Sequence, residues 1–245
     1  MALIAPALLA ANFARLGEAL RALEAAGCRM VHVDVADGHF TSDVTVGQPV
    51  VESIRKATRL ELDLHLLIES PERYVPEFVQ AGADRIAVHP ESTPHLYHAL
   101  KLIRRSGAKA GVALGPGTPL SSISELLRDL DFLNILTADP DDALASCSEE
   151  HELIPAQLDK LDQVVRLRRQ LALRFEVQVE GGVTGVNVED VARAGADILV
   201  SGFDIFHSQD PSARLADLIR AASRPAAVDC SGESQSFAGG ASTVS

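Results

Sequence analysis

Short apolar runs alternate with longer amphipathic runs along the chain as far as about residue 222. The short runs have the length and composition of strands, and they lie near residues 3–6, 30–35, 60–67, 84–88, 109–114, 131–136, 174–179 and 197–201. The longer runs have helical spacing, and they lie near residues 13–26, 47–57, 72–81, 94–106, 120–128, 156–171, 186–195 and 212–222. Strands that alternate with helices form parallel sheets, and these repeated units predict a single (β/α)8 TIM barrel of the α/β class.

Small residues and a glycine recur where a predicted helix ends and the next strand begins. This happens at residues 26–28, 81–84, 106–109 and 194–197. Glycine at the end of a helix adopts the left-handed conformation that a bulkier residue resists. The repeat therefore supports the barrel and carries no functional signal of its own.

Two regions depart from the alternation. Residues 137–155, after the sixth predicted strand, predict a long acidic loop. After Arg224 the chain is rich in serine, glycine and alanine and has no apolar period. We therefore expect a barrel domain over residues 1–223 and a disordered tail over residues 224–245 that takes no part in the chemistry.

Composition narrows the functional classes. A length of 245 residues is typical of one barrel domain, and a net charge of -12 disfavours nucleic acid or an anionic membrane as partner. The three cysteines are scattered, which argues for a reducing compartment and against a disulfide framework or a thiolate zinc site. No apolar run is long enough to span a membrane, and the first residues lack the basic region of a signal peptide. We expect a cytoplasmic protein.

Two histidines and two acids lie at the ends of predicted strands. His32 and Asp34 share one face of the second strand, His65 ends the third, and Glu180 ends the seventh. The carboxyl ends of barrel strands meet at one mouth, so we expect these four side chains to gather there and to bind a divalent metal. A metal flanked by two carboxylates suits removal of a proton beside a carbonyl. Taken singly, each residue has a structural alternative, as a hydrogen-bonded core histidine or a helix-capping acid.

Several segments resemble the ribulose-phosphate 3-epimerase family, and the resemblance runs from about residue 3 to residue 222. They are residues 3–13 (LIAPALLAANF), 32–40 (HVDVADGHF), 63–66 (DLHL) and 180–183 (EGGV). The resemblance implies one divalent metal held by His32, Asp34, His65 and Glu180. It also implies that Asp34 and Glu180 act on opposite faces of a ketose, where one removes the C3 proton and the other returns a proton through an enediolate. The donor types suit Zn, Fe(II), Mn or Co.

The match has departures near the expected substrate. The family usually has aspartate where Glu180 stands and serine where Ala7 stands, and Asn12 replaces an aspartate. Methionines that usually line the cavity are replaced by Ala36, Leu67 and Leu136. Glutamate is one methylene longer than aspartate, and a misplacement of about 1 Å can cost on the order of 100-fold in rate.

The phosphate-binding elements depart furthest. By resemblance, phosphate is held by three glycine-containing loops; Gly181 and Gly182 survive in the second, and Gly202 in the third, where Phe203 replaces a serine. The first loop is replaced by residues 139–151, which contain several acids and no glycine. Carboxylates near a phosphate repel it, so we expect weak turnover of ribulose 5-phosphate. The alternative is a loop that points outward with its acids in solvent.

The resemblance places further residues around the substrate. Ala7, His89, Gly181, Gly182, Gly202 and Phe203 are the expected substrate-binding positions. The leading hypothesis is a metal-dependent ketose 3-epimerase acting on a sugar or sugar phosphate, in a homo-oligomer. A non-catalytic, metal-binding relative with a regulatory or binding role is the alternative. A different reaction through the same enediolate, such as aldol cleavage or isomerisation, also stays open.

Overall fold

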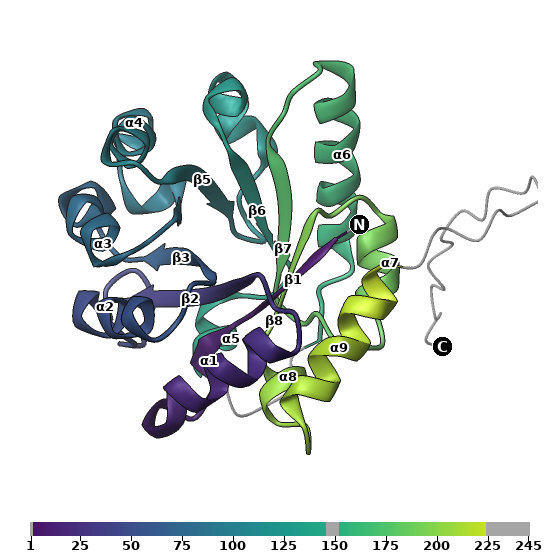
Figure 1. The fold of residues 1–245 in the computed structure, drawn as a ribbon. Coiled ribbons are helices and arrows are strands. Elements are labelled where there is room, and N and C mark those ends of the chain that lie inside the picture. Colours follow the sequence, from purple (N-terminus) through teal and green to yellow (C-terminus); the bar gives the residue numbers. More distant parts are fainter. Residues whose placement is uncertain (1, 146–151, 224–245) are drawn as a thin grey trace, which may run out of the picture.

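The computed structural model describes residues 2–145 and 152–223. Its parallel strands form one sheet that curves into a barrel with helices around the outside (Figure 1). The strands are β1 (Leu3–Pro6), β2 (Met30–Ala36), β3 (Glu61–Leu67), β4 (Arg85–Val88), β5 (Lys109–Leu114), β6 (Phe132–Leu136), β7 (Glu176–Glu180) and β8 (Ile198–Ser201). Hydrogen-bonded pairing runs in chain order from β2 to β8 and then from β8 to β1. A parallel bridge between Ala7 and His32 joins β1 to β2. The predicted TIM barrel is confirmed.

The helices follow the predicted order and cover the outer face of the sheet. The longer ones are α1 (Leu16–Ala25), α2 (Gln48–Ala57), α3 (Val75–Ala81), α4 (Leu96–Ser106), α6 (Ala156–Gln170), α7 (Val188–Arg193) and α9 (Pro211–Ala222). Residues 120–128 differ in type, because they belong to a 3-10 helix, η5 (Leu120–Asp129). Short turns of helix, η1 (Leu8–Ala10), η2 (Phe13–Arg15), η3 (Pro71–Arg73), η4 (Pro90–Ser92) and α8 (Phe203–Phe206), lie in the connections.

Strand β2 shows why apolar strands can deliver polar side chains to the barrel interior. All seven of its residues are buried. Val31, Val33 and Val35 pack in the large core between sheet and helices, and the alternate positions include His32 and Asp34. The register of β2 on β3 places Asp34 beside His65, so residues far apart in sequence become neighbours.

The predicted glycine turns are present. Gly82 and Gly107 cap α3 and α4 with φ angles of 115° and 104°, a region that L-residues rarely adopt. They reverse the chain from helix to strand at the amino end of the barrel, the end away from the predicted site.

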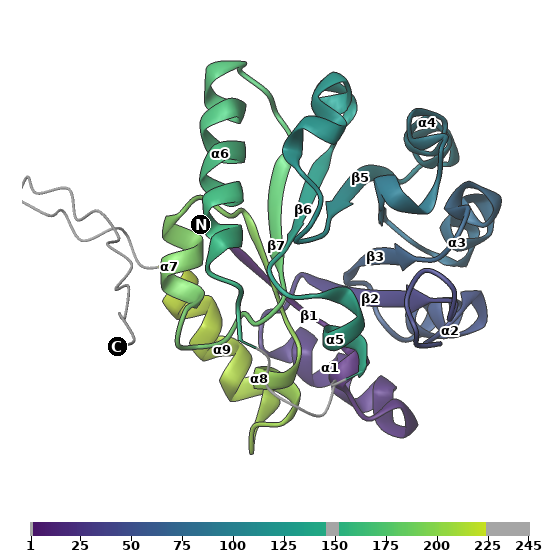
Figure 2. The ribbon, with the colours of Figure 1, turned by 180° about the vertical axis from the view of Figure 1, so that it is seen from behind.

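The acidic segment after β6 is not wholly a loop. Residues Pro140–Ala145 form α5, which lies across the mouth of the barrel (Figure 2). Residues 146–151 lie outside the described part of the chain, as does the predicted tail over residues 224–245. Within the described part, no helix has the length and apolar character needed to cross a membrane.

Candidate active site and metal centre

The predicted metal ligands come together at the mouth of the barrel. His32, Asp34, His65 and Glu180 each offer a ligand atom, and these atoms all lie within 4.8 Å of one another. They come from β2, β3 and β7. The two histidines and Asp34 are buried, and the Glu180 side chain is 16% exposed, so the group opens toward the mouth. We call these four residues the ligand cluster.

The distances within the ligand cluster fit a single small cation. Asp34 Oδ1 lies 3.1 Å from His32 Nε2 and 3.3 Å from His65 Nδ1. Glu180 lies 3.3 Å from His32 Nε2 through Oε2 and 3.1 Å from His65 Nδ1 through Oε1. Ligands about 2.1 Å from a tetrahedral ion are about 3.4 Å apart, which is close to each of these distances. Two neutral imidazoles and two carboxylates are also a donor set that divalent first-row metals accept.

Each histidine is held from behind by its other nitrogen. His32 Nδ1 lies 2.6 Å from Asp63 Oδ2, so its Nδ1–H donates to a carboxylate and leaves Nε2 facing the cluster. His65 Nε2 lies 2.8 Å from His89 Nε2, and His89 Nδ1 lies 3.6 Å from Glu91 Oε2. When His65 Nδ1 is a ligand, Nε2–H donates to His89, whose own N–H then faces Glu91. Such partners fix the tautomer and orientation of metal-binding histidines.

His89 lies behind His65 and packs against two rings. It is 1% exposed, its ring stacks on His65 at a centroid distance of 5.0 Å, and the centroid of the Phe40 ring lies 4.8 Å from its own. His89 therefore supports His65 from behind, and its predicted contact with the substrate stays a prediction.

The two acids are held differently. Glu180 Oε2 accepts a hydrogen bond from Asn134 Nδ2, and the backbone carbonyl of Glu180 accepts from Thr137 N at 2.7 Å. Both contacts come from β6 or its end: Asn134 holds the carboxylate beside the histidines, and Thr137 holds the backbone. Asp34 uses Oδ1 for both histidines, and Oδ2 has no hydrogen-bond partner among the described residues. Asp34 therefore keeps one oxygen available at the mouth.

The carboxylates and imidazoles of the ligand cluster shift one another's pKa values. Burial alone would raise the pKa of the Glu180 carboxyl, but His65 and His32 beside it hold that pKa well below its usual range. Burial lowers the pKa of the His65 imidazole, yet the nearby Glu180 and Asp34 raise it to about 9. The same balance raises the pKa of His32. Without an ion, protons on the histidines offset the two carboxylates, so a divalent cation would replace them.

An apolar roof covers one side of the mouth. Leu144 of α5 is buried against Ala36 and Leu67, with Leu9 and Phe40 packed on the same group. We call these five residues the roof. Asp141 Oδ1 accepts from the backbone N–H of Ser42 at 2.6 Å, which attaches α5 to the loop after β2. Leu144 thus fills space beside the small side chain of Ala36, and Asp141 is engaged by a backbone donor.

The remaining predicted substrate positions follow the carboxyl ends of β1, β7 and β8. Gly202 lies where an added Cβ would meet the Cβ atoms of Ala7 and Ala10 at 3.1 and 3.3 Å, so the small residues fit together. Gly181 and Gly182 have φ angles of 111° and 65°. Phe203 stacks on His207 with a centroid distance of 4.4 Å.

The acid beside Phe203 does not face the mouth as a free charge. Asp204 is bound by Arg214, with contacts of 2.7 and 2.8 Å from Nη2, and it accepts from the N–H of Gly185 at 2.8 Å. The negative charge of Asp204 is therefore offset by Arg214.

Three supporting residues escaped the sequence analysis: Arg85, Asn134 and Gln178, all with 0% exposure. These residues could have been found as polar residues inside otherwise apolar strands, because a buried polar side chain needs a hydrogen-bond partner. Asn134 within Phe132–Leu136 shows the pattern most clearly. Asp63, two residues before His65, contacts His32 from behind.

The fold and the ligand cluster together define a class: a TIM barrel with a candidate divalent-metal centre at the carboxyl ends of its strands. The sequence profile of the ribulose-phosphate 3 epimerase family matches residues 3–206. The chain belongs to this family. It is 41% identical over 228 residues to the ribulose-5-phosphate-3-epimerase, chloroplastic, of Arabidopsis thaliana, covering 92% of this chain and 79% of that protein. It is 37% identical over 216 residues to the ribulose-phosphate 3-epimerase of Bacillus subtilis, covering 88% and 97%.

Solved structures of other enzymes share the fold. A structure of KGPDC from Streptococcus mutans superposes with a TM-score of 0.70 at 15% identity, covering 90% of this chain and 97% of that chain. The 3-hexulose-6-phosphate synthase from Salmonella typhimurium gives 0.67 at 16% identity, covering 90% and 98%. At this level of identity the likeness concerns the barrel alone.

Proposed function

We propose that the chain is a metal-dependent ketose 3-epimerase in which Asp34 and Glu180 exchange protons at C3. The observation that carries the proposal is the pair of carboxylates, one from β2 and one from β7, each within 3.3 Å of both imidazole rings. Epimerisation needs a base on one face of the carbon and an acid on the other. A non-catalytic relative is not favoured, since the whole donor set and its supporting partners are retained.

His32, Asp34, His65 and Glu180 would hold the divalent ion. When bound, that ion would stabilise negative charge that develops on the carbonyl and hydroxyl oxygens beside C3. The proton moves between C3 and the two carboxylates. Asp34 acts through Oδ2, which has no partner in the described part of the chain, and Glu180 acts from a position fixed by Asn134. Asp63 and His89 keep the ring nitrogens aimed at the cluster.

The roof would protect this exchange. Leu9, Ala36, Phe40, Leu67 and Leu144 give the mouth an apolar side. An apolar cover keeps water from protonating C3 at random and strengthens the electrostatic interactions beneath it. The substrate class we propose is a small ketose, and the names of the relatives make ribulose 5-phosphate the first candidate.

Exchange of deuterium from solvent into C3 tests the proposal. The protein is purified without chelator and incubated in heavy water with ribulose 5-phosphate and with unphosphorylated ribulose, and C3 is followed by NMR. We expect exchange and inversion with at least one ketose, and about one divalent ion per chain by elemental analysis. The His32→Ala, His65→Ala double variant should lose both the ion and the exchange. Full metal retention in that variant, or no exchange with any ketose, contradicts the proposal.

A further inference from the structure

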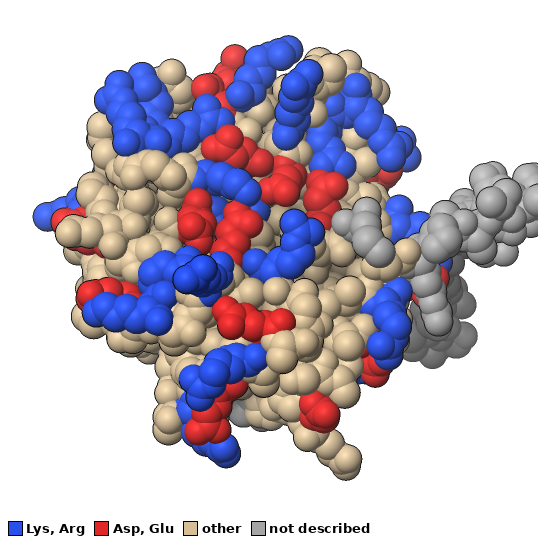
Figure 3. All heavy atoms as spheres, viewed as in Figure 1, with Lys and Arg blue, Asp and Glu red and all other residues tan. Residues whose placement is uncertain are grey.

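The amino end of the barrel carries basic side chains that the proposed reaction does not use. Lysines and arginines gather there around a central group of acidic side chains (Figure 3). A hollow of about 530 Å³ lies on this face, between the starts of β5, β6 and β7. Arg104, Lys109, Arg128 and Arg174 line it together with Asp131 and Glu176. We call it the Arg128 hollow; a chain with a net charge of -12 has here a local excess of positive charge.

The two carboxylates of the Arg128 hollow already have partners. Asp131 binds Arg104 through two contacts of 3.0 and 3.1 Å and accepts from the N–H of Ala110 at 2.8 Å. Glu176 pairs with Arg85 from inside the barrel at 2.9 Å. By contrast, Arg128 and Arg174 have no acid partner among the described residues. Both guanidinium groups are therefore available to a ligand.

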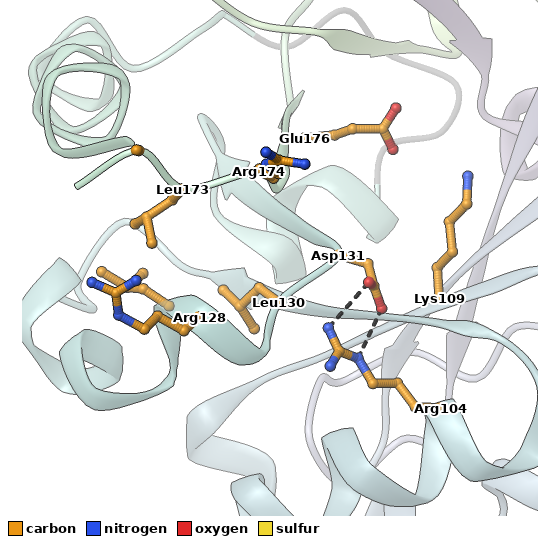
Figure 4. A pocket seen from close by; sticks show the side chains of 10 residues that line it. Arg104, Lys109, Arg128, Leu130, Asp131, Leu173, Arg174 and Glu176 are labelled. Carbon is orange, nitrogen blue, oxygen red and sulfur yellow. Dashed lines mark hydrogen bonds and ion pairs between the residues drawn. The ribbon is translucent and has the colours of Figure 1, made fainter. Parts of the chain in front are cut away.

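The neighbouring side chains indicate the chemistry of that ligand. Figure 4 shows Arg128 and Arg174 at the hollow with Leu130 and Leu173 beside them. Guanidinium groups bind phosphate oxygens through paired N–H donors, and an apolar wall favours a ligand with an apolar part. The volume lies in the range of small-molecule sites. We propose that the Arg128 hollow binds a small molecule that carries a phosphate group beside an apolar portion, at the opposite end of the barrel from the ligand cluster.

Titration calorimetry of the metal-loaded full chain with phenyl phosphate and with inorganic phosphate tests this site. We expect saturable binding of phenyl phosphate, tighter than that of inorganic phosphate. The Arg128→Gln, Arg174→Gln double variant should lose at least about tenfold in affinity. Arg21→Gln, an exposed arginine on α1, is the matched control and should bind as the parent does. Both variants should keep the parent's C3 exchange rate, which separates this site from the mouth. Absence of saturable binding at millimolar phenyl phosphate, or equal affinity in the double variant, overturns the proposal.

A second inference comes from the barrel interior, where Arg85 is completely buried. Its Nε lies 3.0 Å from Asp63 Oδ1, its Nη1 donates to Glu176 Oε2 at 2.9 Å, and its guanidinium carbon lies 3.8 Å above the Phe132 ring. Burial of an arginine is costly unless it is paired on several sides. Arg85 therefore links two acids: Asp63, which supports His32, and Glu176, at the amino end of the barrel.

The two oxygens of Asp63 divide between Arg85 and the metal site. Oδ1 faces Arg85, whereas Oδ2 holds His32 Nδ1 at 2.6 Å and accepts from Gln178 Nε2 at 2.9 Å. The positive charge of Arg85 beside Oδ1 favours this orientation of the carboxylate, which aims the His32 ring at the cluster. We infer that Arg85 is a positioning residue that acts through Asp63 on His32; its relevance to catalysis rests on the proposed function, but the contact itself does not.

NMR of histidine-labelled full chain tests the inference without needing activity. The His32 Nδ1–H, donated to a buried carboxylate, should give a downfield proton resonance. Arg85→Met should shift or abolish this resonance. Arg85→Lys keeps the positive charge and should retain the resonance in part, so it tests the inference even where the methionine variant folds poorly. Arg104→Gln, an exposed paired arginine, is the control. Metal affinity should fall most in Arg85→Met, less in Arg85→Lys, and not in Arg104→Gln. A resonance and a metal affinity unchanged in both Arg85 variants overturn the inference, whereas failure of the proposed function alone would leave the NMR result intact.

Discussion

Each imidazole of the ligand cluster turns one nitrogen to the carboxylates and the other to a buried partner, but the partners differ. His32 is backed by a carboxylate, Asp63, whereas His65 is backed by another imidazole, His89. Burial lowers the pKa of His89, so that ring is neutral at neutral pH. A carboxylate behind an imidazole increases its basicity more than a neutral ring does. The two histidines are therefore unequal donors.

Removing either acid should stop inversion while affecting proton exchange differently. We expect Asp34→Asn and Glu180→Gln each to lower epimerisation by about 10²- to 10⁴-fold, because each face of C3 needs its own acid or base. A variant that keeps the base for one epimer should still exchange the C3 proton with solvent from that side. Turnover and deuterium incorporation are measured in parallel, starting from each epimer. Unimpaired turnover of the Asp34→Asn protein would contradict the two-base mechanism.

Metal affinity should rise with pH because protons compete for the same nitrogens. The nearby carboxylates raise the pKa of His65 to about 9 in the ion-free protein, above the value of about 6.5 in an unfolded chain. Protonation thus stabilises the ion-free fold fully below about pH 6.5, and this stabilisation is lost as the pH rises through about 9. We expect affinity to increase up to about tenfold per pH unit for each displaced proton across this window and then to level off.

Competition with a chelator at constant ionic strength measures this dependence. His98→Gln changes an exposed histidine on α4 and should leave the profile unchanged. An affinity that does not vary between pH 6.5 and 9 would count against the ligand cluster as the binding site.

At the scale of elements, the segment after β6 is where this chain differs most from the family pattern. Its described residues, 137–145 and 152–155, contain no glycine, and Pro140–Ala145 form α5 where the resemblance implies a glycine-rich loop. Its Leu144 completes the roof, and its Asp141 is bound to the loop after β2. A site for phosphate needs free N–H donors, and in this segment the N–H of Asp141 already donates to Asp139 Oδ1 at 3.0 Å.

We therefore expect ribulose 5-phosphate to be turned over less efficiently than by the Bacillus subtilis relative under the same conditions. Inorganic phosphate should inhibit this chain poorly. Two changes should improve the KM for the phosphorylated ketose: a glycine-rich segment in place of residues 139–153, and Phe203→Ser. Steady-state kinetics with ribulose 5-phosphate and with ribulose provide the measurement. A specificity constant for ribulose 5-phosphate equal to that of the relative would show that Gly181, Gly182 and Gly202 suffice.

Gly181 holds the turn that leads away from Glu180, and it should not tolerate a side chain. Its φ angle is 111°, and an added Cβ would lie 2.6 Å from the backbone nitrogen of Ala138. Gly181→Ala should cost more than about 1 kcal/mol in the free energy of unfolding, or roughly 2–4 °C in Tm for each kcal/mol. Gly117→Ala is the matched control, because nothing lies within 4 Å of its Cβ position. Calorimetric Tm values that do not separate the two variants would contradict this account.

Most of the fold can be predicted from the sequence, because the spacing of apolar residues and the glycines that end helices are local properties. Every predicted strand is present, with bounds that differ by a residue or two, since apolar β-branched runs and helix-ending glycines need no knowledge of distant neighbours. The ligand cluster could be anticipated for a related reason: the barrel brings all carboxyl strand ends together.

The rest depends on contacts that only the folded chain creates. The pairing of Asp63 with Arg85, the stacking of His89 on His65 and the attachment of Asp141 to Ser42 join residues whose separation gives no periodic signal. Helix α5 was missed because its acidic composition is typical of a loop, whereas packing of Leu144 on Ala36 and Leu67 stabilises it as a helix. Contacts between distant parts of the chain therefore determine both these side-chain pairings and the helical structure of α5.

At the scale of the whole molecule, the site joins opposite sides of the barrel. The cluster takes residues from β2, β3 and β7, and a bridge from Ala7 to His32 connects β1 to β2. An ion bound to these three strands would tie the β2–β3 pair to β7 across the barrel axis. Because a ligand that binds only the folded chain stabilises it, metal content and stability must be linked.

Removal of the metal should therefore lower Tm by an amount that depends on free metal concentration. At a free concentration of about 100 times Kd, binding contributes about 2.7 kcal/mol, which for a domain of this size corresponds to roughly 5–11 °C. Differential scanning calorimetry of metal-loaded and chelated protein gives the difference, and titration of the metal back into the chelated sample should restore it along the logarithmic dependence. The His32→Ala, His65→Ala variant should show no such dependence, because its donor set is incomplete. A Tm shift of equal size in that variant would place the stabilising metal elsewhere on the molecule.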